Sequence, residues 1–191
     1  MTVAHRERVV RAATSSFLAH GYRSSVDEIA RRAGVAKQTV YHHFPSKDEL
    51  FKEVARDLAA RVLVELESPP QDLREGLLRF GLAYRQRTLG AQGISAFRTL
   101  VPEVPRFRGV ARAMYANSVG EMVRRIGAWL ARAMDEGRLR REDPQFAAEM
   151  LLSMLAGLDR VKRLFSVNDE AESEARRTAR IVDCFLRTLE K

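Results

Sequence analysis

Five polar side chains between Lys37 and His42 are of the types that hydrogen-bond to nucleic acids. Lys37, Gln38, Thr39, Tyr41 and His42 can together donate and accept at base edges and at phosphates. They project from one side of a short predicted helix, and an α-helix has a diameter that suits the major groove of DNA. The run therefore predicts contact with duplex DNA.

The residues before this run predict the helix that supports it. Ser25 begins a capping box, in which the serine oxygen accepts from the third helical amide and Glu28 reaches back to the serine amide. Apolar residues at helical spacing give that helix one buried face, and Gly34 permits a tight bend. Two helices joined by a glycine-containing turn predict a helix-turn-helix over residues 25–44.

The polar helix, about residues 36–43, is too short to be stable alone. Val40 and Phe44 must therefore hold it against its neighbours. Pro45 then breaks the chain, and a second capping box begins at Ser46.

The rest of the pattern predicts an all-α chain of about nine helices. Apolar residues recur at three and four rather than at two, which favours helices over strands. The proline pair after Ser68 marks the expected boundary between an N-terminal domain, 1–62, and a C-terminal domain, 68–191. Besides the two helices of the motif, helices are expected at about 2–20, 46–66, 71–89, 92–101, 107–135, 144–165 and 170–189.

The stretch from Ala30 to Phe51 resembles a known family. Its pattern, A-x(3)-G-V-x(3)-T-V-Y-x-H-F-x-S-K-x-x-L-F, is similar to the DNA-binding signature of TetR/AcrR-type transcriptional regulators. The resemblance implies a three-helix N-terminal domain and a helical C-terminal domain for ligand binding and dimerisation. It also implies a homodimeric repressor that binds a palindromic, double-stranded DNA operator and is released by a small ligand.

The resemblance also implies roles for individual residues. Tyr41 and Lys47 are expected to contact phosphate, and Ser25 stands at a helix N-terminus able to seat one. From the residue types we expect base contacts from Gln38, Thr39 and His42, and Lys37 belongs to the same DNA-binding set without an assigned base or phosphate. His43 lies beside Phe44 and is expected to be packed rather than to contact bases.

The C-terminal part resembles an AefR-like branch of this family. The resemblance rests on Phe97-Arg98 through Glu103, Pro105-Arg106-Phe107, Met114-Tyr115, Gly137-Arg138-Leu139, Asp143-Pro144 and Ala147-Ala148. In this chain Arg108 follows Phe107, where the family often has proline.

Aromatic residues and methionines in the C-terminal helices are candidates for the wall of a ligand cavity. Methionine adapts to varied partners and aromatic rings suit flat apolar ligands, so such a cavity favours an unknown small hydrophobic effector. Ordinary core packing is the alternative for each residue. The candidates are Phe80, Tyr84, Phe97, Met114, Tyr115, Met122 and Met150.

The last two helices carry two apolar stripes, more than one small domain needs to cover itself. We therefore expect a homodimer interface there, with internal packing alone as the alternative. The residues expected at its centre are Met154, Leu158, Ile181 and Phe185.

The composition limits the location of the chain. A formal net charge of +8 over 191 residues favours polyanionic partners. The single cysteine, Cys184, excludes an internal disulfide framework, so a reducing, cytoplasmic location is expected. No run approaches 18 consecutive apolar residues, so no membrane span is expected.

The distribution of reactive residues argues against an enzyme. All four histidines lie in the first 43 residues, and Cys184 lies in an apolar stripe of the last expected helix. This excludes a Ser/His/Asp or Cys/His apparatus in the C-terminal domain, and no His/Cys cluster has metal spacing. No glycine-rich phosphate loop is present, and we expect no cofactor.

Two other classes stay open from the sequence. Residue types alone do not exclude carboxylate chemistry. A nucleoid or interaction protein that binds DNA without sequence preference and without an effector would share the helix-turn-helix.

Overall fold

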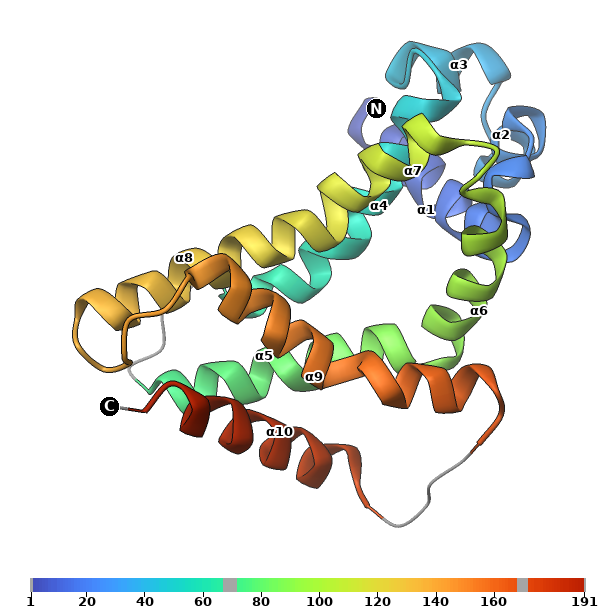
Figure 1. Ribbon diagram of the computed structural model, residues 1–191. Coiled ribbons are helices and arrows are strands. Elements are labelled where there is room, and N and C mark those ends of the chain that lie inside the picture. The colour runs from blue at the N-terminus through green and yellow to red at the C-terminus, as the bar shows by residue number, and fades with distance from the viewer. Residues whose placement is uncertain (1, 67–71, 168–171, 191) are drawn as a thin grey trace. The chain divides into compact units, whose positions relative to one another are not determined.

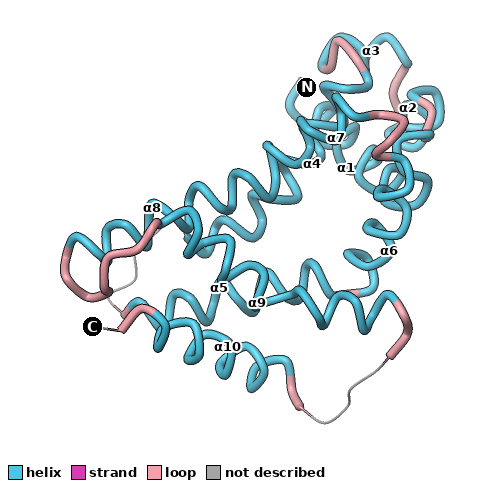
Figure 2. The backbone as a smooth tube through the Cα atoms, viewed as in Figure 1, coloured by secondary structure: helices cyan, strands magenta, loops and turns pink. Residues whose placement is uncertain are grey.

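The structure, a computed structural model, describes residues 2–66, 72–167 and 172–190, and within these ranges it contains helices and no strand (Figures 1 and 2). The predicted all-α fold class is confirmed. The α-helices are α1 (Thr2–His20), α2 (Val26–Ala33), α3 (Lys37–His43), α4 (Lys47–Leu63), α5 (Leu73–Leu89), α6 (Ala91–Leu100), α7 (Arg108–Tyr115), α8 (Glu121–Asp135), α9 (Pro144–Leu164) and α10 (Glu174–Thr188).

The helix predicted over about 107–135 contains an irregularity. Between α7 and α8 the residues Ala116–Gly120 form a π-helix, so one predicted helix becomes two α-helices. The Asn117 side chain donates to the Ala113 carbonyl at 2.6 Å, and Ser118 donates to Met114 at 2.7 Å. These side-chain bonds supply partners to carbonyl groups in the segment where the α-helical pattern changes.

The chain forms two compact units, each built from two stretches of sequence. The head unit contains residues 1–58 and 95–118, and the bundle unit contains residues 59–94 and 119–191. The proline pair expected as a domain boundary lies outside the described residues. The domain limits 1–62 and 68–191 therefore stay predictions.

In the head unit, α1, α2, α3 and the first part of α4 share one apolar core. Val9, Ala13 and Phe17 are spaced at four along α1, and all three are buried. The ring of Phe17 meets that of Phe51 from α4 edge to face, with centroids 4.8 Å apart. This core fixes the helix-turn-helix on the longer helices beside it.

A later stretch of the sequence completes the head unit. The Phe107 ring lies 4.5 Å from the Tyr22 ring, and Arg23 forms an ion pair with Glu103 at 2.9 Å. Gly21 has a φ of +61°, and a Cβ there would lie 3.1 Å from Thr99 Cγ2. Glycine is therefore needed both for its backbone conformation and for this close approach.

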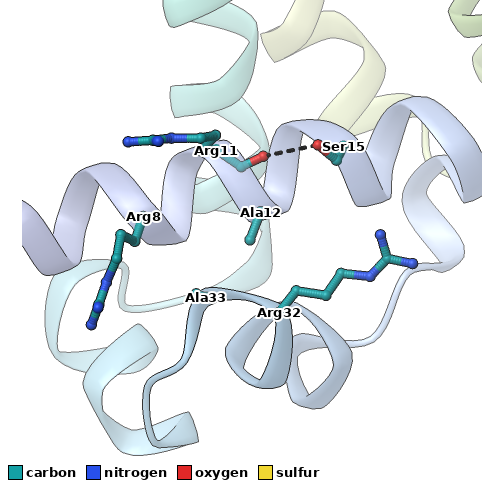
Figure 3. Close-up of a pocket in the computed structure, with 6 residues that line it drawn as sticks. All are labelled: Arg8, Arg11, Ala12, Ser15, Arg32 and Ala33. Atoms are coloured by element: carbon teal, nitrogen blue, oxygen red, sulfur yellow. Dashed lines mark hydrogen bonds between the residues drawn. The ribbon is translucent and has the colours of Figure 1, made fainter.

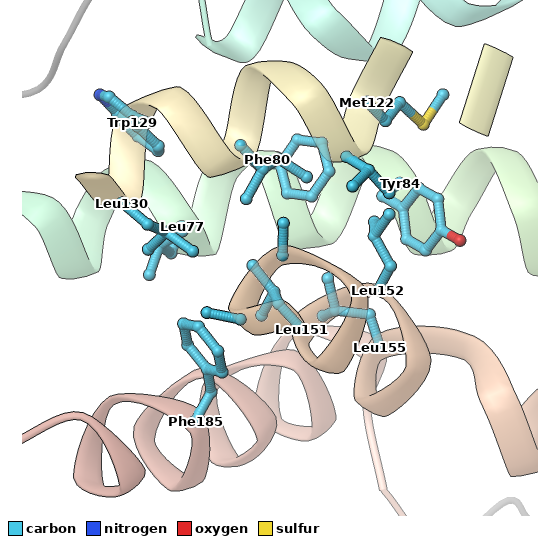
Figure 4. Close-up of a cluster of buried hydrophobic side chains, with 14 of the residues drawn as sticks. Leu77, Phe80, Tyr84, Met122, Trp129, Leu130, Leu151, Leu152, Leu155 and Phe185 are labelled. Carbon is cyan, nitrogen blue, oxygen red and sulfur yellow. The ribbon is translucent and has the colours of Figure 1, made fainter. Parts of the chain in front are cut away.

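The bundle unit packs α5, α8, α9 and α10 around a second core. Figure 4 shows side chains of these four helices converging on one buried cluster. Asp143 caps α9 by accepting from the amides of Gln145 and Phe146, and Pro144 occupies the first turn. The cluster includes Leu77, Phe80, Tyr84, Met122, Trp129, Leu130, Leu151, Leu152, Leu155 and Phe185.

One arginine is buried in the bundle unit with several partners. Arg85 of α5 is 3% exposed. Its guanidinium donates to the Leu155 carbonyl at 2.6 Å, to Asp159 at 2.7 Å and to Glu174 at 2.9 Å. A buried cation is tolerated where its donors are satisfied, so this network ties α5 to α9 and α10.

Among the described residues, no helix is both long and apolar enough to cross a membrane.

Candidate nucleic-acid interface

The frame of the helix-turn-helix contains the serine half of the capping box expected from its sequence, while the Glu28 carboxylate pairs with Arg32. Ser25 caps α2 by accepting from the amide of Glu28 at 3.1 Å. The Glu28 carboxylate accepts from Arg32 at 2.9 Å. Gly34 ends α2 with a φ of +64°, in the left-handed region that glycine enters without strain.

The short helix α3 has one buried face and one exposed face. Val40 and the capping residue Phe44 are buried in the core of the head unit. The neighbouring positions on the other face are exposed, and Thr39 is half-buried at its edge. That exposed face carries Lys37, Gln38, Tyr41 and His42, so the structure brings four of the predicted DNA-contacting residues together.

The two predicted lysine contacts differ in their surroundings. Lys37 Nζ forms an exposed ion pair with Asp27 of α2 at 2.9 Å. Lys47 Nζ lies 4.3 Å from the centroid of the Tyr22 ring, and burial lowers the pKa of this lysine. The Tyr22 hydroxyl donates to Asp48, so Lys47 is held at the start of α4 by an aromatic ring that is itself anchored.

His43 is half-buried next to the exposed His42, and the two rings lie 5.3 Å apart. Burial lowers the pKa of His43, and the nearby His42, His5 and Arg6 lower it further. These surroundings favour the neutral form of the imidazole. The prediction that His43 packs rather than points outward agrees with this position.

The seven residues predicted to line a ligand cavity fall in both units. Phe80, Tyr84 and Met122 are buried in the core of the bundle unit, and Met150 packs against that core. The Phe80 and Tyr84 rings stack with centroids 5.8 Å apart. The other three, Phe97, Met114 and Tyr115, belong to the head unit. Phe97 and Tyr115 are exposed there, and Met114 lines a small apolar cavity.

The residues predicted for a dimer interface differ in exposure. Leu158 is 65% exposed on α9, and Met154 and Ile181 are half-buried. Phe185, however, is fully buried in the core of the bundle unit. The apolar spacing of α10 predicts an outward stripe that includes Phe185. For Phe185 this prediction is wrong, because its side chain lies on the face that packs into the core.

Other polar residues of the structure were not singled out from the sequence. Arg8 and Arg11 of α1 lie beside Arg32 of α2 around a hollow in the head unit. Their spacing of three on one helix was a signal that they share a side. Arg85 gave no such signal, because its acidic partners lie more than 70 positions away in the sequence.

The described residues contain no group of His, Cys, Asp and Glu placed to hold a metal ion. The candidate site consists of the hydrogen-bonding side chains that α3 exposes.

Comparison with protein families decides the identity of this architecture. Residues 9–54 match the family described as bacterial regulatory proteins, tetR family. Residues 75–189, more than half of the chain, match the C-terminal domain of AefR-like transcriptional repressors. The chain belongs to the TetR family of transcriptional regulators. Both resemblances expected from the sequence are confirmed.

Individual members of the TetR family are similar to this regulator over different lengths. The A-factor receptor protein of Streptomyces griseus is 37% identical over 87 residues, which are 44% of this chain and 32% of that protein. The match thus spans about a third of the receptor. The transcriptional repressor AcnR of Corynebacterium efficiens is 25% identical over 182 residues, covering 90% of this chain and 93% of that protein.

A solved structure, the flavonoid-responsive regulator FrrA, has the same fold as this TetR-family chain. The two superpose with a TM-score of 0.77 at 27% identity, covering 97% of each chain. The relatives are transcriptional regulators rather than enzymes, and this agrees with the argument from the distribution of histidine and cysteine.

Proposed function

We propose that this TetR-family regulator is a homodimeric repressor that binds a palindromic operator through α3 and is released by a small hydrophobic effector. The exposed polar face of α3 is the observation that carries the proposal. Lys37, Gln38, Tyr41 and His42 are exposed on a helix whose opposite face is held in a core. Side chains fixed in this way can enter a major groove without reorganising the head unit.

Within this face, we assign base contacts to Lys37, Gln38, Thr39 and His42. Lysine, glutamine and threonine can pair with base edges, and the assignment extends to the exposed histidine ring. We assign phosphate contacts to Tyr41 and Lys47, which stand at the end of α3 and the start of α4. The α2 N-terminus at Ser25 offers a further place for a phosphate.

Dimerisation is supported by exposed apolar residues on α9. We name five residues the α9 stripe, because they follow one another at helical spacing on one side: Phe146, Met154, Leu158 and Val161 of α9 and its capping residue Phe165. All except Met154 are exposed. A row of large apolar side chains in water marks an interaction surface, and a second copy covers it in a two-fold dimer. A dimer then presents two α3 helices to two half-sites.

The effector is proposed to contact the aromatic end of the bundle core. The stacked Phe80 and Tyr84 rings and the Met122 side chain offer an apolar wall. Burial raises the pKa of Tyr84, while its hydrogen bond with Arg160 acts in the opposite direction. This tyrosine–arginine pair is a candidate partner for one polar group of the effector. The description of FrrA as flavonoid-responsive supports an aromatic or otherwise apolar effector class.

Selection from a pool of random DNA tests this function. The full-length protein should enrich a palindromic sequence, and it should bind that sequence at least 1,000-fold more tightly than random DNA at the same salt concentration, in the range usual for specific regulators. Equal affinity for both would favour the nucleoid alternative. Compounds that release the operator should then be titrated against the parent and against Tyr84→Phe, and an unchanged affinity would remove Tyr84 from the effector site.

A further inference from the structure

The head unit contains a hollow between α1 and α2 that the helix-turn-helix does not use. It has a volume of about 330 Å³, and Figure 3 shows three arginines around it. We name it the arginine groove and define it by the residues that line it: Arg8, Arg11, Ala12, Ser15, Arg32 and Ala33.

The sequence explains why a hollow forms there. Positions 8, 11, 12 and 15 fall on one side of α1, since residues three and four apart are neighbours on a helix. Ala12 and Ala33 supply only a methyl group each where the two helices approach, so space remains between the longer side chains. The result is a hollow lined by two alanines, one serine and three arginines.

The arginine groove is positively charged. None of its lining residues is acidic. Among the described residues, the Arg8 and Arg11 guanidinium groups have no hydrogen-bond or ion-pair partner, whereas Arg32 forms an ion pair with Glu28 at 2.8 Å. Unpaired guanidinium groups bind phosphate well, because their planar donors match its oxygens in pairs.

The arginine groove begins close to the helix that we propose enters the DNA. Two of its lining residues, Arg32 and Ala33, are the last residues of α2, and only three residues separate them from α3, which begins at Lys37. Arg8 and Arg11 line the same hollow from α1. An arginine side chain of the arginine groove can therefore reach backbone phosphates close to those that border the DNA major groove in which we place α3.

We propose that the arginine groove is a second DNA contact of the head unit, one that takes backbone phosphates flanking the base pairs contacted by α3. This proposal rests on the proposed function. The contact is independent of sequence, so it adds affinity and leaves the choice of operator to α3. A small phosphate compound is the other possible source of this anionic chemistry. DNA is favoured because the arginines are exposed on the same compact unit as α3.

The test compares two double variants with the same loss of charge. Arg8→Ala with Arg11→Ala removes the unpaired cations of the arginine groove. Arg108→Ala with Arg112→Ala removes two exposed cations from α7 of the head unit, outside the groove. All four side chains are exposed, so both variants should fold, and circular dichroism checks that they do.

Each protein is titrated with an operator duplex that ends at the selected core and with one extended by about one helical turn, roughly 10 base pairs, on each side. The parent and the α7 variant should bind the longer duplex more tightly. The groove variant should lose that gain, and the slope of its log affinity against log salt should fall by about 1.8, the value for two phosphates. Its preference for operator over random DNA should stay the same. Equal gains and slopes for the two variants would overturn the proposal.

Two further measurements distinguish a failure of the arginine-groove proposal from a failure of the proposed function. If the parent selects no operator, the proposed function fails, yet long random duplexes still test the groove: its variant should bind them more weakly than the α7 variant. Titration with inorganic pyrophosphate addresses the other source. Pyrophosphate binding that is lost in the groove variant, together with unchanged DNA binding, would show a small-anion site and would overturn the DNA proposal.

Discussion

The head unit and the bundle unit differ in which side chains they expose to solvent: polar ones on α3 of the head unit, and large apolar ones on α9 of the bundle unit. On α3 of the head unit, Lys37, Gln38 and His42 stand in water with a buried apolar face behind them. On α9 of the bundle unit, large apolar side chains are exposed to solvent, and Phe165, which caps this helix, is 78% exposed. The same unit buries a charge, because Arg85 is almost inaccessible.

This contrast separates side chains whose interactions are satisfied within the unit from side chains whose interactions are not. Arg85 has carboxylate and carbonyl partners within its own unit, so its donors are used by the fold. Arg8 and Arg11 have no such partners among the described residues, and the α9 stripe has solvent where a core residue has neighbours. Groups whose interactions are satisfied stabilise the unit, and groups whose interactions are not satisfied mark its surfaces for DNA or for a second copy.

Arg85→Ala should produce the largest effect. It removes the donor to the Leu155 carbonyl and leaves Asp159 with Arg177 as its remaining cation, and we expect a loss of about 3 kcal/mol in the free energy of unfolding, measured by urea denaturation. Arg79→Ala is the control, because Arg79 pairs with Glu75 on the surface of the same helix. Its effect should stay within about 0.5 kcal/mol. Equal losses for the two variants would contradict the structural role of the buried network.

Acid should reduce the difference between Arg85→Ala and the parent. Although burial opposes it, the hydrogen bond and charge of Arg85 lower the pKa of Asp159. A lowered carboxyl pKa stabilises the fold above the unfolded value of about 3.9, and this stability is lost as the pH falls through the folded value. Denaturation at pH 7 and below pH 4 measures the change.

Leu158→Glu should have the next largest effect, on assembly. A charge in the α9 stripe should give monomers in sedimentation experiments, and the loss of paired half-site binding should weaken operator affinity by about 100-fold. Because Leu158 is 65% exposed, the variant should keep its helical content. Leu82→Glu on α5 is the matched control and should remain a dimer. An intact Leu158→Glu dimer would reject the α9 stripe as the interface.

Gln38→Ala should affect DNA alone. Removing a bidentate base contact is expected to weaken operator binding by about 2 kcal/mol, roughly 30-fold, while random DNA binds as before. The melting temperature should not change, since Gln38 is exposed. Fluorescence anisotropy with the operator and the random duplex measures the ratio of the two affinities. A parallel loss on random DNA would assign Gln38 to the backbone rather than to a base.

Lys47→Ala should weaken operator and random DNA by the same factor, roughly fivefold at physiological salt, and make the salt slope shallower by about one. It also removes the contact with the Tyr22 ring, so a fall in the unfolding free energy of about 0.5 kcal/mol should accompany it. Lys47→Arg keeps the charge and should restore the slope. No recovery of the slope in that variant would point to a role in packing only.

Asp27→Asn should have the smallest effect, and of opposite sign. It releases Lys37 from its ion pair and removes a negative charge beside α3, so DNA affinity should rise roughly twofold to threefold. Folding should change little, because exposed ion pairs stabilise proteins only weakly. Asp57→Asn, on α4 of the same unit, is the control. An unchanged or reduced DNA affinity would mean that Lys37 does not take part in binding.

The sequence was sufficient for the features that depend on local chemistry. Ser25, Gly34 and the alternation of buried and exposed positions along α3 follow from capping, backbone freedom and helical spacing, which act over a few residues. The ends of α1, α2 and α3 were predicted for the same reason, to within one residue. The family signature over Ala30 to Phe51 then supplied the regulator class, and the family comparisons confirm it.

Features that depend on distant contacts were not predictable in this way. The burial of Arg85 requires Asp159 and Glu174 to meet it, and no local pattern signals such a meeting. Phe185 and Cys184 are adjacent on α10, yet one is buried and the other exposed, so assigning the face needed the packing of α5 and α9. The π-helix at Ala116–Gly120 changes the helical register at a point that the apolar periodicity does not reveal.

The discontinuous head unit has a consequence for how the chain is made. Residues 1–58 leave the ribosome before residues 95–118, whose Phe107 packs on Tyr22. Synthesis proceeds at about 5 to 20 residues per second, so the 60 positions between Leu58 and Ser118 take roughly 3 to 12 seconds to follow. During that interval the Tyr22 ring lacks its contact with Phe107, and the head unit is complete only after the α6–α7 segment has been translated.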